Sequence, residues 1–122
     1  MHGVAVCDDA PTFERIVARI SSELSFIAGH LPSHRWEVVE GYRGPAYGVA
    51  TEAMRATIRR VARTEGLLLD TSYTGKAMHA LVCEALAGRW TGRVLFWHTG
   101  GAFSLFAQGP ELLSDATGES HG

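Results

Sequence analysis

The chain has little of what would point to a nucleic-acid, membrane or metal function. Its formal net charge is −2, so we expect no basic surface for nucleic acid or acidic membranes. No apolar run approaches the roughly 20 residues that span a bilayer, so we expect no membrane insertion. The hydrophobic content of 46% and charged content of 20% are typical of one globular domain. A small molecule or another protein is therefore the expected partner.

Cysteine and lysine are both scarce. Cys7 and Cys83 fall in predicted apolar elements, without metal-ligand spacing and without a secretory apolar region before them. We interpret both as reduced core thiols of a cytoplasmic protein. Lys76 is the only lysine, and the other ten of the eleven basic residues are arginine. Four arginines in one predicted helix (Arg55, Arg59, Arg60 and Arg63) are interpreted as a solvated helix face.

No metal site is predicted. The acidic pair Asp8 and Asp9 follows an apolar run, but Pro11 and Thr12 come directly afterwards. Capping of a helix N-terminus is therefore the simpler account of the pair. His79 lies within a predicted helix and is interpreted as a half-buried or partner-facing side chain rather than a base.

Apolar periodicity predicts strands that alternate with helices. The expected strands are Gly3–Cys7, Trp36–Glu40, Leu67–Leu69 and Arg93–Trp97, and the expected helices run from Pro11 to about Gly29, Thr51 to about Thr64, and Gly75 to about Ala87, with a short helix or irregular cover at Ala102–Ala107. This order predicts a three-layer α/β fold with a mostly parallel sheet and right-handed βαβ crossovers. The apolar run Leu67–Leu69 is typical of a strand covered on both faces.

The limits of the domain are also predicted from composition. We expect one domain over residues 1–107 and a disordered tail over 108–122, where apolar periodicity is lost and Gly, Ser, Asp and Glu accumulate. The first strand follows Met1 almost at once, which we take as an indication that sheet neighbours are missing.

Polar residues follow two of the predicted strands. Tyr73, Thr74 and Gly75 offer a phenol, a hydroxyl and the free N–H groups of a helix N-terminus, and His98–Gly101 offers two glycines that let a ligand approach the backbone. Ligands of open α/β sheets bind at such strand ends, so we expect both segments to line one pocket. A helix cap and a plain tight turn remain alternatives. Tyr47, in the glycine-rich loop Gly41–Gly48, is either a pocket wall or a side chain packed on the core.

Four blocks together carry a family resemblance: Glu65–Asp70, Tyr73–Met78, Val94–Gly101 and, upstream, Gly44–Gly48. In this order they resemble the C-terminal portion of the D-cysteine desulfhydrase and 1-aminocyclopropane-1-carboxylate deaminase family. That family belongs to the tryptophan-synthase-β-like, fold-type II enzymes that use pyridoxal phosphate (PLP). The resemblance covers about residues 3–107 and implies a PLP-dependent lyase or deaminase of amino-acid metabolism that acts on a small amino acid.

The resemblance assigns roles to five residues. Tyr73 would stand beside cofactor and substrate and move a proton, and Tyr47 would face it across the pocket. Thr74 replaces the glutamate of the deaminases, which favours the desulfhydrase type and α,β-elimination. Thr99 would hydrogen-bond the pyridine nitrogen without protonating it, and Gly100 would lie close to the ring.

The sequence departs from the family in two ways. Thr71 and Ser72 stand where Pro-Val is usual, and Ala102–Ser104 stands where Val-Pro-Ala is usual, so the pocket's shape is expected to differ. The family's Schiff-base lysine, its carboxylate-binding Ser-Asn loop and its phosphate loop belong to earlier parts of family chains, and Lys76 is not the Schiff-base position. The cofactor site is therefore expected to be incomplete.

Three hypotheses follow. The leading one is the C-terminal part of a D-cysteine desulfhydrase-like PLP lyase, either a truncated product or one piece of a split enzyme, which is inactive without the N-terminal half. Its expected protein partner is a complementing N-terminal chain or a second copy of itself. The second is a non-catalytic α/β module that binds a ligand or partner protein through an exposed sheet face. The third is an enzyme that uses Lys76 itself.

Overall fold

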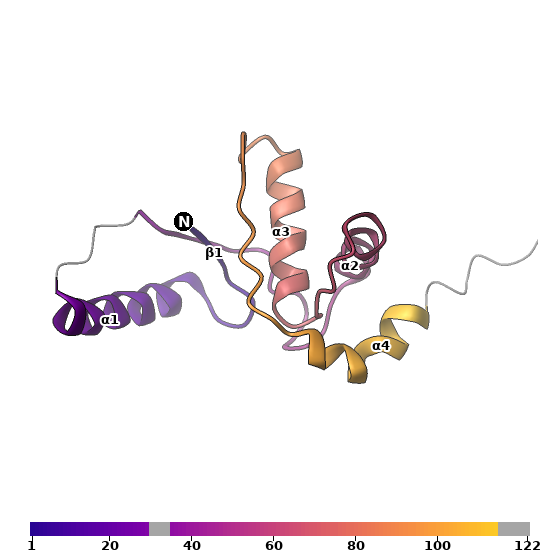
Figure 1. Ribbon diagram of the computed structural model, residues 1–122, viewed down its shortest axis with the longest axis horizontal. Coiled ribbons are helices and arrows are strands. Elements are labelled where there is room, and N and C mark those ends of the chain that lie inside the picture. Colours follow the sequence, from indigo (N-terminus) through magenta and orange to yellow (C-terminus); the bar gives the residue numbers. More distant parts are fainter. Residues whose placement is uncertain (30–34, 115–122) are drawn as a thin grey trace, which may run out of the picture.

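The computed structural model describes residues 1–29 and 35–114. Its elements are β1 (His2–Val4), α1 (Ala10–Ala28), β2 (Glu37–Val39), α2 (Glu52–Glu65), α3 (Thr74–Leu86), the 3-10 turn η1 (Ala102–Ser104) and α4 (Leu105–Ser114). Figure 1 shows α2 beside α3, α1 extending away from both, and the segment after α3 running back along that helix. Within the described part, no helix combines the length and apolar character needed to cross a membrane.

The first two predicted strands are present and form a parallel pair. β1 and β2 lie parallel, with His2 opposite Glu37 and Val4 opposite Val39. The intervening helix α1 makes the crossover between them, as the alternating pattern predicted. Because parallel strands need such a crossover, this unit is the part of the α/β prediction that the described residues confirm.

Local capping signals place the helix boundaries. The Asp9 side chain accepts a hydrogen bond from the Thr12 N–H at 3.0 Å, which confirms that it caps α1. Thr51 caps α2 in the same way by accepting from the Met54 N–H at 3.3 Å. Gly66 ends α2 in the left-handed conformation with φ 68°, which glycine adopts without strain. These boundaries match the predicted ones because they depend on near neighbours in sequence.

The core lies between α2, α3 and α4. Its buried members are Ile58, Val61, Leu69, Met78 and Leu112, and partly buried Leu81, Val82, Phe96 and Leu105 pack against them. Helix α4 thus continues past the expected domain end and brings Leu112 into the core. Residues 108–114 of the expected tail are helical, while the remaining 115–122 lie outside the described residues.

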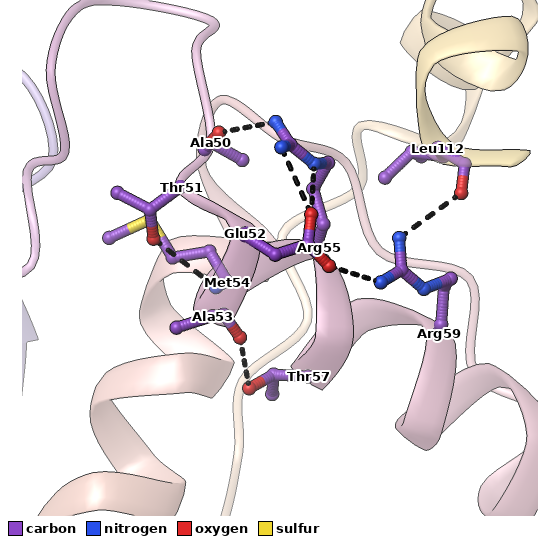
Figure 2. Close-up of polar contacts among 9 residues, drawn as sticks. All are labelled: Ala50, Thr51, Glu52, Ala53, Met54, Arg55, Thr57, Arg59 and Leu112. Carbon is purple, nitrogen blue, oxygen red and sulfur yellow. Dashed lines mark hydrogen bonds and ion pairs between the residues drawn. The ribbon is translucent and has the colours of Figure 1, made fainter. Parts of the chain in front are cut away.

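Two of the four arginines correct the expectation of a solvated face. Arg55 donates to the Ala50 carbonyl at 2.8 Å and pairs with Glu52 at 3.0 Å. Arg59 pairs with the same Glu52 and donates to the carbonyl of Leu112 at 3.4 Å, as Figure 2 shows. The network joins the start of α2 to α4, because long guanidinium groups can reach several acceptors at once.

The two later strand predictions were wrong for this structure. Neither residues 67–69 nor residues 93–97 belong to a strand, and the described sheet contains β1 and β2 alone. Leu68 is 59% exposed and Leu95 is 85% exposed, whereas a strand covered on both faces would bury them. The physical reason is that a strand exists only through hydrogen bonds to a neighbour, and among the described residues no neighbour pairs with these segments.

Other apolar side chains are also more exposed than predicted. No residue of α1 is buried, and Ile20, Leu24 and Ile27 of its apolar stripe are exposed. Cys7 is exposed and Cys83 half-buried, which corrects the expectation of two core thiols. On α3 the buried position near the C-terminal end is Glu84, while Leu86 is exposed.

Candidate functional site

The turn before α3 is organised by a buried carboxylate. Asp70 accepts hydrogen bonds from the N–H groups of Ser72 and Tyr73, both at 2.6 Å, and from the N–H and hydroxyl of Thr74 at 3.1 and 2.6 Å. Burial alone would raise the pKa of Asp70, but the bonds from Thr74, Tyr73 and Ser72 outweigh it and hold the pKa below its ordinary value. The N–H groups of Tyr73 and Thr74, which were expected to be free for an anionic ligand, therefore already bind the Asp70 carboxylate.

Contacts between the two predicted strand ends confirm that they meet. His98 Nε2 lies 3.0 Å from the Leu68 carbonyl oxygen, and His98 Nδ1 accepts from the Gly100 N–H at 3.1 Å. Gly101 has φ 95°, and a Cβ atom placed on it would overlap the Asp70 carboxylate. Glycine is thus required there both by the backbone conformation and by the close approach.

An open groove of about 950 Å³ runs along α3, between β1 on one side and residues 93–97 on the other. Tyr73, Thr74 and Thr99 all line it, so three of the five candidate residues share one groove. Gly100 is exposed but is not among the lining residues. The groove has an apolar wall of Val94 to Trp97 and contains no acidic side chain in its lining.

The fifth candidate, Tyr47, reaches the groove through Tyr73. The two phenol oxygens lie 2.7 Å apart, and the rings meet edge to face with centroids 5.7 Å apart and an interplanar angle of 74°. The hydrogen bond to Tyr47, followed by burial, raises the pKa of Tyr73 above its ordinary value. Tyr73 is therefore a protonated phenol at neutral pH, and it stays 45% exposed beside the groove.

Lys76 lies away from the groove. Its side chain is fully buried, with 0% exposure, and its amine donates to the carbonyl oxygens of Arg43 at 2.6 Å and Ala46 at 2.9 Å. Burial lowers the pKa of this amine. These contacts argue against the hypothesis that Lys76 is the catalytic amine, because both acceptors belong to the loop that carries Tyr47 rather than to the groove.

A polar cluster that the sequence motifs did not predict lies beside the groove. Glu84 pairs with Arg89 and accepts a hydrogen bond from the Tyr42 hydroxyl at 2.6 Å. The Arg89 guanidinium, with the Tyr42 hydroxyl, lowers the pKa of Glu84 to about 2. The available signal was an acidic residue among the apolar positions of α3, with a basic residue five positions later.

His79 confirms its interpretation as a half-buried side chain. Its Nδ1 lies 2.8 Å from the Thr57 hydroxyl, and Nε2 lies 3.7 Å from the Cys83 sulfur. Burial lowers the pKa of the imidazole. Across the described residues, no cluster of His, Cys, Asp or Glu could hold a metal ion.

Comparison with known proteins identifies the family of this chain. Residues 3–100 match the family model described as pyridoxal-phosphate dependent enzyme. The chain belongs to this family. It is 38% identical over 109 residues to a D-cysteine desulfhydrase of Serratia proteamaculans (strain 568), and 36% identical over 110 residues to one of Salmonella schwarzengrund (strain CVM19633). Each alignment covers 88% of this chain and 32% of the relative.

A solved structure gives the same result for the fold. A crystal structure of an ACC deaminase homologue matches with a TM-score of 0.83 and 34% sequence identity, over 93% of this chain and 34% of that chain. These findings confirm the resemblance read from the four sequence blocks. The fold is that of a portion of a fold-type II PLP enzyme, and the chain spans about a third of the length of the relatives it matches.

PLP is the cofactor of the family, and two hydroxyl groups that line the groove can be compared with it. Tyr73 and Thr99 offer hydroxyl groups beside an open space, which suits the edge of a flat heteroaromatic ring. No lysine lines the groove, since the single lysine is buried beneath the loop. The hydroxyl groups that line the groove therefore fit one side of the PLP ring.

Proposed function

We propose that this chain is the C-terminal part of a PLP-dependent lyase that acts on a small amino acid by D-cysteine desulfhydrase-like α,β-elimination. The main support is that Tyr73 and Thr99 line one groove. The Tyr73 hydroxyl is also hydrogen-bonded to that of Tyr47. Identity of 36–38% to two D-cysteine desulfhydrases supports the same class of reaction. We place the enzyme in amino-acid metabolism of the cytoplasm, with Thr74 rather than the deaminases' glutamate favouring elimination over ring opening.

Tyr73 is proposed to hold a proton on its phenol oxygen and to pass it to the substrate. Bound PLP would supply the electron withdrawal that lets a proton leave the substrate's α carbon. The Tyr73 hydroxyl borders the groove, and its raised pKa keeps the proton on the phenol oxygen until a substrate atom takes it. Tyr47, at 2.7 Å, fixes the direction of that hydroxyl.

The three other candidate residues are proposed to contact the cofactor. The Thr99 hydroxyl lines the groove and would hydrogen-bond the pyridine nitrogen without protonating it. The Thr74 hydroxyl already donates to the Asp70 carboxylate and accepts from the Asp70 N–H at 3.0 Å, so it would contribute mainly by setting the shape of the groove. Gly100, with φ 105° and no side chain, would let the ring approach the backbone.

We propose that an N-terminal chain, or a second copy of this chain, completes the site. Leu95 and Trp97 border the groove and are 85% and 79% exposed, so a partner would bury them. Residues 67–69 and 93–97 would then join β1 and β2 in a mostly parallel, three-layer sheet with βαβ crossovers. Without that partner we expect no activity, because the covalent attachment for PLP is missing.

Reconstitution tests the proposal. The chain would be titrated with PLP alone, and then together with the N-terminal two thirds of a D-cysteine desulfhydrase. We expect a visible absorbance band of bound cofactor and release of sulfide from D-cysteine in the mixture only, with both lost when Tyr73→Phe and Thr99→Val are combined. A mixture that forms a complex but binds no PLP would instead favour a non-catalytic binding module.

A further inference from the structure

The amine of Lys76 is the most deeply buried cationic group in the described part of the chain, and the mechanism above does not use it. Its side chain has no exposed surface, and the amine donates to two carbonyl oxygens, those of Arg43 and Ala46. A buried charged group is costly unless its donors find acceptors. Both acceptors lie in one loop, so the interaction joins the first turn of α3 to that loop.

The loop in question, Gly41–Gly48, is shaped around this contact. Gly44 has φ 72°, and a Cβ atom on it would lie 3.1 Å from the Val49 carbonyl oxygen and 3.6 Å from the Lys76 amine. The Ala46 carbonyl oxygen accepts from the Lys76 amine and also from the Val49 N–H at 3.2 Å. Tyr47 follows Ala46 directly, so the backbone that carries Tyr47 is held by the amine on its N-terminal side.

A second contact holds the loop on its C-terminal side. The Thr71 hydroxyl donates to the Gly48 carbonyl oxygen at 2.8 Å. Thr71 belongs to the same turn as Tyr73, and it is fully buried. Tyr47 is thus held between two hydrogen-bonded carbonyls, one bound from α3 and the other from the turn that precedes it.

We propose that Lys76 is a positioning residue, which fixes the Gly41–Gly48 loop so that the Tyr47 phenol meets the Tyr73 phenol. The amine acts as a hydrogen-bond donor, since among the described residues it makes no ion pair. The ionisable groups that act on it over a longer range are Cys7 and Asp70. The importance of this geometry for catalysis rests on the proposed function, but the positioning itself does not.

The composition of the chain makes the test direct. With one lysine and three tyrosines, selective isotope labelling gives a single Lys76 side-chain signal and three assignable tyrosine rings in NMR spectra. The nuclear Overhauser effect (NOE) between the Tyr47 and Tyr73 rings measures their contact without any cofactor. In the wild-type chain we expect that NOE, together with a Lys76 amine protected from solvent exchange.

Lys76→Met removes the amine while keeping an unbranched apolar stem in the same space. We expect loss of the Tyr47–Tyr73 ring NOE and a Tyr73 pKa that falls toward its ordinary value, with the α3 backbone signals retained. Arg60→Met is the matched control, since it removes an exposed cation of α2 and should leave the ring contact unchanged. A persistent ring NOE in folded Lys76→Met would overturn the proposal.

A second variant decides the matter if Lys76→Met does not fold. Gly44→Ala leaves the lysine intact but disturbs the loop, so the ring NOE and the protection of the Lys76 amine should decrease together. A change in one without the other contradicts the proposal, as does a wild-type Lys76 signal that exchanges like an exposed lysine. Failure of reconstitution with PLP would refute the proposed function and leave these NMR outcomes unaffected.

Discussion

Substitution of Asp70 by asparagine tests the turn that organises the candidate site. Asparagine has nearly the same shape, but its amide nitrogen must replace one of the two carboxylate oxygens. If Oδ1 still accepts from Ser72 and Tyr73, the new N–H2 group faces the Thr74 N–H, which now lacks an acceptor. A buried donor without a partner costs about 1–3 kcal/mol. The hydrogen bonds that remain lose their charged acceptor, which costs about 1 kcal/mol more. We therefore expect Asp70→Asn to lower the free energy of unfolding by about 2–4 kcal/mol.

Urea unfolding followed by circular dichroism measures this loss, and Asp9→Asn is the matched control. Asp9 also caps a helix, but it is exposed, and asparagine caps about as well as aspartate. Asp9→Asn should therefore lower the free energy of unfolding by less than about 0.5 kcal/mol. The reasoning about Asp70 is refuted if its replacement by asparagine costs no more than the control.

The pH dependence of the same difference has a defined sign. The pKa of Asp70 in the folded chain lies below its ordinary value of 3.8, so the ionised form is favoured by folding. The stabilisation is then fully present above pH 3.8 and is lost as the pH falls through the folded-state pKa. The gap in unfolding free energy between wild type and Asp70→Asn should accordingly narrow below that pH, whereas a gap that widens on acidification contradicts the account.

Three further outcomes are expected. Gly101→Ala should lower the free energy of unfolding by at least about 2 kcal/mol in urea titrations, because a left-handed backbone and an overlap with a carboxylate both oppose a Cβ atom. Tyr47→Phe should shift the pKa of Tyr73 down toward 10.0 in an ultraviolet absorbance titration, and an unchanged value would show that the hydrogen bond does not act on it. Arg89→Met should raise the pKa of Glu84 from about 2 toward 4.5 by carboxyl NMR, and a value that stays near 2 would contradict the role of that ion pair.

Helices were predictable here because their signals are local. Asp9 and Thr51 cap helices three residues before the N–H groups that they accept from, and Gly66 ends α2 by its own conformational freedom. The absence of strands at 67–69 and 93–97 was not predictable, because a strand depends on pairing with neighbours that are often distant in sequence. Their apolar runs predicted strands, yet among the described residues nothing pairs with them.

Part of the candidate site was also predictable. Tyr73, Thr74 and Thr99 were found from the motifs at two strand ends, and they do line one groove. The family resemblance predicted that Tyr47 faces the pocket from the opposite side, whereas its hydroxyl contacts that of Tyr73 directly. Residue types alone left Tyr47 as either a pocket wall or a core side chain. The role of Lys76 was missed, since a lone lysine in sequence predicts an exposed side chain or a catalytic amine and rarely a buried anchor.

The contacts that hold the site differ in kind from those that hold the sheet. Gly101 packs against Asp70, and His98 lies within hydrogen-bond distance of the Leu68 carbonyl oxygen. Short contacts therefore keep the segments around residues 68–70 and 98–101 together. The apolar faces of the same segments remain exposed, as the 85% exposure of Leu95 shows. A completing partner would therefore bury apolar surface along 93–97 while meeting the Tyr73 phenol and the Thr99 side chain, which already line the groove. Binding of that partner should cost little ordering of the site itself, because its hydrogen bonds are made in advance.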